Sequence, residues 1–454
     1  MNTLAGADHP NKHAWRFFLL PLAIYALLAA LYLLAIPSGE SPDEPGHLQC
    51  IEQVAVNGRL PIREPKPSGD TWWARESIIA GQMCYHMPLH YLLAGSLLRV
   101  VSTVSGTTLT FEFPPTNQEF GQEAALFEHD EPSLWQAAEP LSLLSLRLLS
   151  IMLGLVSVAG SFALARAFVP EEPLVATLAA VLAAGWPQLA YLSRAINNDA
   201  LATALAILAL LVLMQTGRPW RFVLLAVLSA LALLSKITVA FAIGVIALVW
   251  LVEYAQRKEA RPAYLRAALV AAAIWLATAI LLLAQPILRE HLLLSSGAFG
   301  DISGKANTLD YWRTVFELTL SSGWARFGWM NLPAPLSHAY LWWALFSASC
   351  IAGFYVLWRS AGTQEQRMML LIGLFWFVAA LLSYLRINLN RLQPQFRFML
   401  AAVPLLTSWA AAGALYPLQK GPRRQWLMIM ATTLVLVGYN IWLILTIVQP
   451  AYTS

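Results

Sequence analysis

The sequence has little charge. Only 12% of its 454 residues are Asp, Glu, Lys or Arg, whereas 58% are hydrophobic. Soluble domains carry charge on roughly 25% of their residues, so this composition excludes a soluble globular protein. The net charge of +4 is small and gathers in short loops. It therefore indicates membrane topology and gives no sign of nucleic-acid binding.

Several catalytic motifs are also missing. The sequence has no Walker motif, no dinucleotide-binding glycine pattern, no zinc-ligand spacing and no Gly-x-Ser-x-Gly elbow. Its three cysteines are too few for a disulfide framework. Cys350 lies within an apolar run, whereas Cys50 and Cys84 share the first polar stretch. A disulfide between these two is chemically permitted if that stretch lies outside the cytoplasm.

Long apolar runs are abundant instead. A helix needs about 20 apolar residues to cross a bilayer, and eleven runs approach or exceed this length. We therefore expect an all-α, polytopic transmembrane helix bundle, with residues 1–454 forming a single integral membrane domain. The predicted spans are 17–36, 143–167, 173–193, 198–215, 220–235, 237–254, 264–286, 339–358, 369–386, 398–417 and 426–448.

The distribution of Lys and Arg predicts which side each loop occupies. With the N-terminus inside and eleven spans, all four basic clusters are cytoplasmic, as the positive-inside rule requires. These clusters are Gly217–Arg221, Gln256–Arg266, Trp358–Arg367 and Gln419–Arg424. Counting Met87–Ser105 as a twelfth span would reverse them, so we interpret it as a juxtamembrane or re-entrant helix. Residues 38–142 and 288–338 are then long external loops, and the C-terminus is outside.

The first candidate site directly follows the first span. Asp43 and Glu44 stand between Pro42 and Pro45, and His47 follows. Prolines on both sides restrict the backbone and predict a rigid turn. A carboxylate here could deprotonate an acceptor hydroxyl or bind a cation. The alternative is an ordinary helix cap, with Asp43 accepting hydrogen bonds from free amides.

Two further external turns contain ionisable residues. Arg194, Asn198 and Asp199 lie between two spans, where Asn198 or Asp199 could simply cap the next helix. Together with the first loop, Arg194 and Asp199 could instead form one polar cavity. Lys236 stands alone in the next hairpin. It is either a snorkelling lysine or a ligand for an anionic headgroup.

A cluster of arginines occupies the last external turn. Arg386, Arg391 and Arg397 lie outside, where the positive-inside rule does not favour them. They require a countercharge, and arginine forks match phosphate well. Bound phosphate and pairing with acidic residues of the first loop both remain open.

Eight short segments of the chain form a recognisable series: Ser41–His47, Asn57–Pro61, Tyr85–Tyr91, Arg147–Ser150, Asn197–Leu201, Leu233–Lys236, Phe327–Met330 and Gln395–Phe398. In this order they resemble the motifs of the GT-C superfamily of polyprenyl-phosphate-sugar glycosyltransferases. The similarity is greatest to the branch of bacterial protein O-mannosyltransferases and lipid A aminoarabinose transferases. Met87 departs from the family pattern by replacing a proline, and Phe396 and Phe398 stand where the family has glycine and tyrosine.

The resemblance implies an inverting transfer from a polyprenyl-phosphate-linked sugar. It implies that Asp43 is the general base, that Glu44 and Asp199 orient the acceptor or the base, and that Lys236 and Arg397 neutralise the leaving phosphate. We expect further donor contacts from Arg386 and Arg391. We expect acceptor or sugar contacts from His47, His86, Tyr85, Asn198 and Arg194. Some branches use a divalent cation, but the nearest branch favours no metal and no other cofactor.

The expected acceptor is a glycan, a lipid or a protein, and the expected place is the periplasmic face of a bacterial inner membrane. A transporter or flippase of a lipid-linked glycan is the alternative. It would need charged residues deep within several spans, and the predicted spans have almost none. A polysaccharide polymerase or ligase would also have a large external loop, but would not be expected to carry the Asp-Glu turn.

Overall fold

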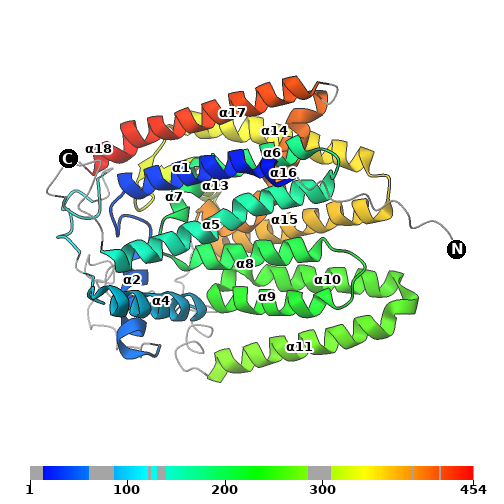
Figure 1. Ribbon diagram of the computed structural model, residues 1–454, viewed down its shortest axis with the longest axis horizontal. Helices are drawn as coiled ribbons and strands as arrows, with labels where there is room; N and C mark the ends of the chain where they lie inside the picture. Colours follow the sequence, from blue (N-terminus) through cyan, green and yellow to red (C-terminus); the bar gives the residue numbers. More distant parts are fainter. Residues whose placement is uncertain are drawn as a thin grey trace.

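The computed structural model describes residues 14–60, 86–111, 113–120, 124–129, 140–284, 308–390, 392–418 and 421–452. These residues are mostly helical, and the long helices run side by side (Figure 1). The helices of the first half are η1 (Ala14–Phe18), α1 (Leu19–Ala35), α2 (Glu44–Asn57), α4 (Leu89–Ser105), α5 (Leu141–Phe168), α6 (Pro173–Ala184), α7 (Pro187–Ser193), α8 (Asn198–Leu213) and α9 (Arg221–Ser235).

The second half continues the bundle and adds a small hairpin. Strands β1 (Arg326–Phe327) and β2 (Leu332–Pro333) pair antiparallel. The helices are η3 (Ile237–Ala240), α10 (Phe241–Gln256), η4 (Lys258–Ala260), α11 (Arg261–Ala284), α13 (Leu309–Trp324), α14 (Leu336–Ser360), α15 (Gln364–Asn390), η5 (Phe396–Ala402), α16 (Val403–Leu415), η6 (Tyr416–Leu418), α17 (Pro422–Leu443), the π-helix η7 (Ile444–Val448) and α18 (Gln449–Ala451).

The predicted all-helical membrane architecture is confirmed. Among the described residues, eight helices are long and apolar enough to cross a membrane, or nine if the bent pair α6–α7 is one span. Each of the eleven predicted spans coincides with a helix or a pair of helices. However, α8 and α9 have only 16 and 15 residues, or about 24 and 22 Å of helix. The count of eleven spans and their orientation therefore stay predictions.

The predicted span 173–193 is broken in the middle. Helices α6 and α7 meet at an angle of 65°. Pro187 occupies the first turn of α7, where its missing N–H costs no helical hydrogen bond. The carbonyl of Gly185 accepts a hydrogen bond of 2.9 Å from the Asn440 side chain, and the indole N–H of Trp186 donates to the carbonyl of Gly323. Asn440 of α17 thus satisfies a backbone carbonyl at the break, as irregular backbone inside a membrane requires, and the Trp186 side chain ties the break to α13.

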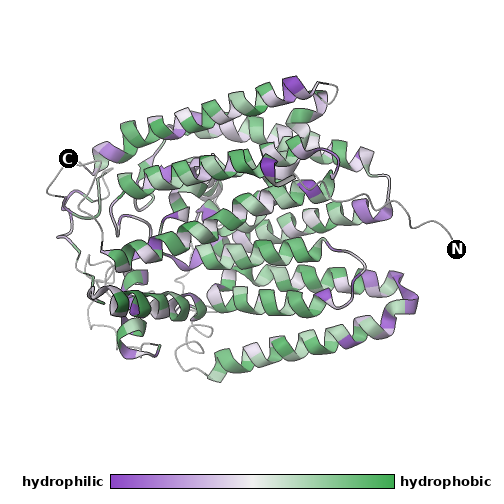
Figure 2. Ribbon diagram, viewed as in Figure 1, coloured by the Kyte–Doolittle hydropathy of each residue, from purple (hydrophilic) through white to green (hydrophobic). Residues whose placement is uncertain are grey.

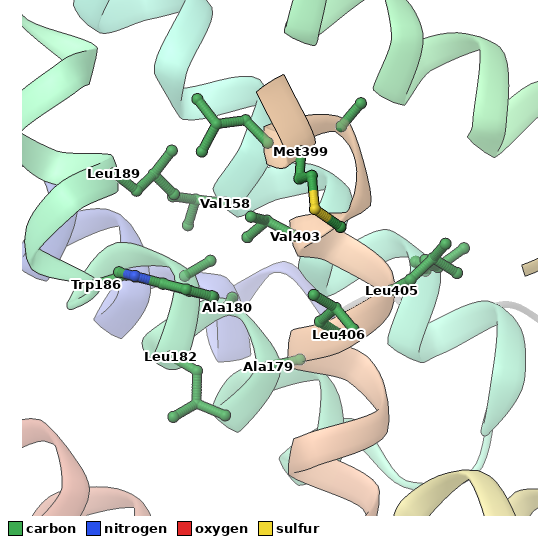
Figure 3. Close-up of a cluster of buried hydrophobic side chains, with 14 of the residues drawn as sticks. Val158, Ala179, Ala180, Leu182, Trp186, Leu189, Met399, Val403, Leu405 and Leu406 are labelled. Carbon is green, nitrogen blue, oxygen red and sulfur yellow. The ribbon is translucent and has the colours of Figure 1, made fainter. Parts of the chain in front are cut away.

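Helix α16 lies at the centre of the bundle. Its residues are mostly buried, as are nearly all those of α6 and α7. It crosses α14 closely, because a Cβ at Gly353 would stand 1.7 Å from the carbonyl oxygen of Trp409. Figure 3 shows Met399 of η5 and Val403 of α16 in one cluster of buried side chains with Val158 of α5 and with Trp186 at the α6–α7 break. This core fixes η5, the segment that carries Arg397.

Helices α2 and α4 pack on each other at one end of the bundle, on the left in Figure 1. Polar residues gather at the ends of the long helices, whose middles are apolar (Figure 2). Cys50 is buried in α2 and takes part in a disulfide bond, while Cys84, the partner that the sequence permits, lies outside the described residues. The predicted external loops 38–142 and 288–338 contain α2, α4, α13 and the β1–β2 hairpin.

Candidate functional site

The segment between α1 and α2 positions Asp43 by an unusual backbone turn. Asp43 has a left-handed conformation with φ of 66° and ψ of 0°, which residues other than glycine seldom adopt. It occupies the N-cap position of α2, but its side chain makes no capping hydrogen bond. The helix-cap alternative therefore does not describe this carboxylate. Its side chain leaves the helix end and reaches Arg397.

Four charged side chains from distant parts of the chain meet at this point. Arg397 Nη2 lies 2.6 Å from Asp43 Oδ2, and Arg397 Nη1 lies 3.7 Å from Asp199 Oδ2. Lys236 Nζ lies 2.5 Å from Asp199 Oδ1. We call Asp43, Asp199, Lys236 and Arg397 the ionic cluster. It joins the start of α2, the start of α8, the end of α9 and the start of η5.

The members of the ionic cluster differ in exposure. The side chain of Asp43 is 27% exposed, whereas those of Arg397, Asp199 and Lys236 are 6%, 8% and 11% exposed. Asp43 is therefore the member that an incoming molecule can reach most easily. The other three form the buried support behind it.

Electrostatics keep Asp43 ionised. Burial raises the pKa of the Asp43 carboxyl, but the positive charges of Arg397, Lys236 and His86, with the Arg397 hydrogen bond, bring it below its ordinary value of 3.8. Burial also lowers the pKa of the Lys236 ammonium, and the neighbouring Asp199 carboxylate only partly offsets this. The cluster thus contains a carboxylate that is charged and reachable at neutral pH.

The guanidinium of Arg397 is buried but only partly satisfied. Its Nε has no hydrogen-bond partner among the described residues, and its contact with Asp199 is too long for a hydrogen bond. The ring of Phe398 lies beneath both cations, 5.1 Å from Lys236 Nζ and 5.5 Å from Arg397 Cζ. Both distances allow a cation–π attraction. A buried arginine fork with spare donors is suited to an oxyanion.

Glu44 belongs to a different group of contacts. Its carboxylate accepts hydrogen bonds from the amides of Gly39, Ser41 and Ile196, at 3.1, 3.3 and 3.0 Å. Arg194 Nη1 lies 3.9 Å from the same carboxylate, and its Nη2 donates to Ser41 Oγ. Glu44 and Arg194 are both fully buried. They fasten the α7–α8 turn to the turn before α2.

Arg194 and Asp199 lie at the same turn but take part in different groups of contacts. The sequence allows Arg194 and Asp199 to share one polar cavity, but Arg194 contacts Glu44 whereas Asp199 contacts Lys236 and Arg397. The structure assigns a supporting position to Glu44 and Arg194. Asn198 also has a supporting position, because its side-chain amide donates a hydrogen bond of 3.3 Å to the carbonyl of Ser235. The cap of α8 is the preceding residue, Asn197.

Histidines of α2 and α4 form a second wall beside the ionic cluster. The ring of His47 lies 6.1 Å from that of His86 and 6.3 Å from that of His90, and His47 Nδ1 is 2.8 Å from the Tyr91 hydroxyl. Burial, with neighbouring positive charges, brings the pKa of His47 well below its usual range. Burial lowers the pKa of His90 to about 4, despite the opposing charge of Asp199. Both rings are neutral at pH 7.

The remaining predicted residues lie elsewhere. Arg386 is exposed on α15 and forms no ion pair with any residue that the structure describes. Arg391 and Tyr85 lie outside the described residues. Of the three arginines predicted to bind phosphate, the structure places Arg397 in the ionic cluster. Its partner is Asp43 of the first loop, the countercharge that the sequence left as an alternative to phosphate.

Glu40 is a buried carboxylate that the sequence reasoning did not single out. It accepts hydrogen bonds of 2.9 Å from the amides of Leu126 and Phe127, and lies 2.9 Å from His129 Nε2. It therefore anchors the loop 124–129 next to the turn that carries Asp43. Glu40 directly precedes the Ser-Pro-Asp-Glu motif, and this position is the feature of the sequence that could have identified it.

The fold and site together define a helical membrane protein with a buried ionic cluster at one end of its bundle. Residues 140–282 match the family described as dolichyl-phosphate-mannose-protein mannosyltransferase. This segment covers less than half of the chain and includes Asp199 and Lys236. The predicted resemblance to GT-C glycosyltransferases is confirmed over this segment. Comparison with curated proteins gives no match.

Solved structures with similar chains include ArnT and an oligosaccharyltransferase. ArnT from Cupriavidus metallidurans bound to undecaprenyl phosphate is 13% identical with a TM-score of 0.48, and the match covers 97% of this chain and 74% of that one. The apo state of the same protein is 13% identical with a TM-score of 0.47, and the match covers 95% of this chain and 73% of that one. The apo oligosaccharyltransferase from Archaeoglobus fulgidus is 14% identical with a TM-score of 0.44, and the match covers 97% of this chain and 55% of that one. At these scores, no residue role in this chain follows from them.

Proposed function

We propose that this protein is a membrane glycosyltransferase that moves a sugar from a polyprenyl-phosphate donor to an acceptor at the outer face of the membrane. The observation that carries the proposal is the ionic cluster. It combines a reachable, ionised carboxylate with two buried cations. The family match over residues 140–282, which include two members of the cluster, supports the same class of reaction.

In the proposed reaction, Asp43 accepts the proton of the acceptor hydroxyl. The acceptor oxygen forms a bond to the anomeric carbon while the bond from that carbon to the phosphate oxygen breaks. The electron pair leaves with the polyprenyl phosphate, and the configuration inverts. Lys236 and Arg397 stabilise the charge that develops on the leaving phosphate, so the mechanism needs no cofactor. Asp199 orients both cations.

The residues around the cluster suggest where the other groups bind. We infer that His47 and His86 contact the sugar or the acceptor, and the hydrogen bond between Tyr91 and His47 supports this by fixing the ring of His47. Glu44, Arg194 and Asn198 would act indirectly, by fixing the turns that carry Asp43 and Asp199. The acceptor, a glycan, lipid or protein, and the periplasmic side of a bacterial inner membrane stay parts of this proposal.

A flippase for a lipid-linked glycan is less well supported. Arg221 and Glu253 form a buried ion pair of 2.8 Å, but Arg221 begins α9 whereas Lys236 follows its last residue. The two charged groups are thus about 22 Å apart along the helix axis. In the described spans, charged side chains lie near one end or the other. No charged side chain of these spans lies midway between the two ends, as a transport path would require.

The proposal is tested by the Asp43→Asn variant. Asparagine keeps the size of the side chain but cannot accept a proton, so sugar transfer should fall by at least about 100-fold, as expected for a lost general base. Transfer of radiolabelled sugar from lipid donor to envelope acceptors measures the effect. Glu119→Gln, which neutralises an exposed carboxylate, is the matched control. Full activity of Asp43→Asn would reject the mechanism.

A further inference from the structure

In the structure, the proposed base is held by the proposed phosphate ligand. Asp43 Oδ2 accepts a hydrogen bond of 2.6 Å from Arg397. A charge-assisted bond of this length stabilises the carboxylate strongly and opposes its protonation. Asp43 is therefore a weak base as long as Arg397 holds it. Something must separate the pair before proton transfer to Asp43 becomes efficient.

The two ion pairs of the cluster differ in how readily they can open. Lys236 and Asp199 are both buried, only 2.5 Å apart, and Lys236 also rests on the Phe398 ring. Asp43 is the most exposed member, whereas its partner Arg397 is fixed by the core around η5. The Asp43–Arg397 contact is thus the one that an incoming anion meets first. Arg397 also has an unpaired Nε to offer that anion.

We propose that the phosphate of the donor displaces Asp43 from Arg397, so that donor binding itself releases the general base. This inference rests on the proposed function. The donor phosphate takes the guanidinium fork, and the freed carboxylate turns to the acceptor hydroxyl. Binding is therefore ordered, with the donor first. Without donor, Asp43 stays bonded to Arg397 and does not activate water or acceptor.

The surroundings of Asp43 determine what its release does. Lys236 and His86 are the other groups whose charge stabilises the carboxylate, whereas burial opposes its ionisation. The Asp199 carboxylate also faces Arg397, and a bound phosphate adds a further negative charge. Once the phosphate has replaced Asp43 at Arg397, burial and the nearby negative charges both raise the pKa of Asp43. The carboxylate becomes a stronger base at the step that needs one.

A double-mutant cycle tests the exchange. The dissociation constant of undecaprenyl phosphate is measured at fixed pH and salt for the wild-type chain in nanodiscs, Asp43→Asn, Arg397→Gln and the double variant. Asp43→Asn should bind about tenfold more tightly, because Arg397 no longer has to leave a carboxylate. In the Arg397→Gln background, the same change should alter affinity less than about twofold. Glu119→Gln should leave affinity unchanged.

Carbodiimide labelling gives a second readout without mutation. The reagent modifies protonated carboxyl groups, so undecaprenyl phosphate should increase the labelling of Asp43 several-fold near pH 6, as measured by mass spectrometry. Unchanged or reduced labelling would overturn the exchange. So would an equal gain in affinity in both backgrounds of the cycle, since this would indicate simple repulsion between Asp43 and phosphate. A wild-type chain that binds no polyprenyl phosphate would reject the proposed function as well.

Discussion

At the residue scale, the proposed chemistry depends on how the Asp43 carboxylate is held. The left-handed backbone of Asp43 is a strained conformation for any residue other than glycine. The strain is maintained by neighbours on both sides, since Glu44 is bonded to three amides and Arg397 holds the Asp43 side chain. The turn therefore presents the carboxylate in one direction, toward η5 and away from the helix amides.

The pKa of Asp43 leads to a prediction about pH. Because Arg397 keeps this pKa below 3.8, the acidic limb of kcat/KM for the wild-type enzyme should lie at or below about pH 4. Activity falls only as pH drops through that pKa. In Arg397→Gln, burial is no longer opposed by the ion pair, so the limb should move to higher pH. Rate measurements between pH 3.5 and 8 provide the check.

Phe398→Leu serves as the control for this shift. It removes the ring beneath both cations but leaves the Asp43–Arg397 hydrogen bond in place. Its acidic limb should match that of the wild-type enzyme. An unshifted limb in Arg397→Gln would show that another group titrates in the profile.

The sequence identified the members of the ionic cluster because each is an ionisable residue in a turn on the same predicted face. It could not determine which charges pair. Arg194 and Arg397 have the same chemistry and similar settings in the sequence, yet one contacts Glu44 and the other Asp43. Side-chain direction depends on the left-handed turn at Asp43, and no residue in the motif indicated it. His90 and Tyr91 belong to a segment that carries the resemblance, but they were not predicted as site residues because they lie on an apolar helix.

At the scale of elements, the closest contact in the bundle is the crossing of α14 and α16. Gly353 and Gly413 face each other there, with their backbone nitrogens near the opposite helix. A Cβ at Gly413 would stand only 2.1 Å from the carbonyl oxygen of Ser349. Small residues allow helix backbones to approach in membranes, where packing provides much of the association energy. Because α16 continues from η5, this crossing also supports Arg397.

We predict that Gly353→Ala separates α14 from α16. Its added methyl group would clash with the backbone of Trp409, at 1.7 Å, and no side chain can move to relieve it. Overpacking of this kind costs roughly 1–3 kcal/mol or more. The unfolding temperature of the purified protein should fall. Gly244→Ala on α10 is the control, because its methyl group would meet nothing within 4 Å; equal unfolding temperatures would contradict the prediction.

The elements themselves could be predicted well from apolar runs, since length and hydropathy define a spanning helix. The break between α6 and α7 was less evident, because Gly-x-Pro is tolerated inside membrane helices. The break depends on tertiary contacts: Asn440 donates to the Gly185 carbonyl, and the Trp186 indole donates to the Gly323 carbonyl. Helix α2 was predicted only as the helix that Asp43 would cap, and α13 was not predicted individually. Their amphipathic sequences are shorter than a span and lie in loops.

At the scale of the whole molecule, charged groups are divided between the two ends of the bundle. The ionic cluster lies at one end, and the Arg221–Glu253 pair at the other. The four basic sequence clusters were predicted to be cytoplasmic, and two of them flank the end that holds Arg221 and Glu253. The ionic cluster would then face outward.

Cysteine labelling tests this orientation. Ser105→Cys, at the exposed end of α4, should react with a membrane-impermeant maleimide in intact spheroplasts. Glu259→Cys, in the exposed turn between α10 and α11, should react only after permeabilisation. Cys350 is buried and Cys50 is disulfide-bonded, so neither adds background. The opposite pattern would place the ionic cluster in the cytoplasm.

The equal number of opposite charges in the ionic cluster has a consequence for how ligands arrive. Two carboxylates and two cations leave almost no field outside the site, so dissolved anions such as chloride or inorganic phosphate gain little by approaching it. A polyprenyl chain changes the situation, because it confines its phosphate to the bilayer plane and raises its local concentration beside the helices. The site would thus bind phosphates that reach it by lateral diffusion in the membrane, and would bind dissolved anions only weakly.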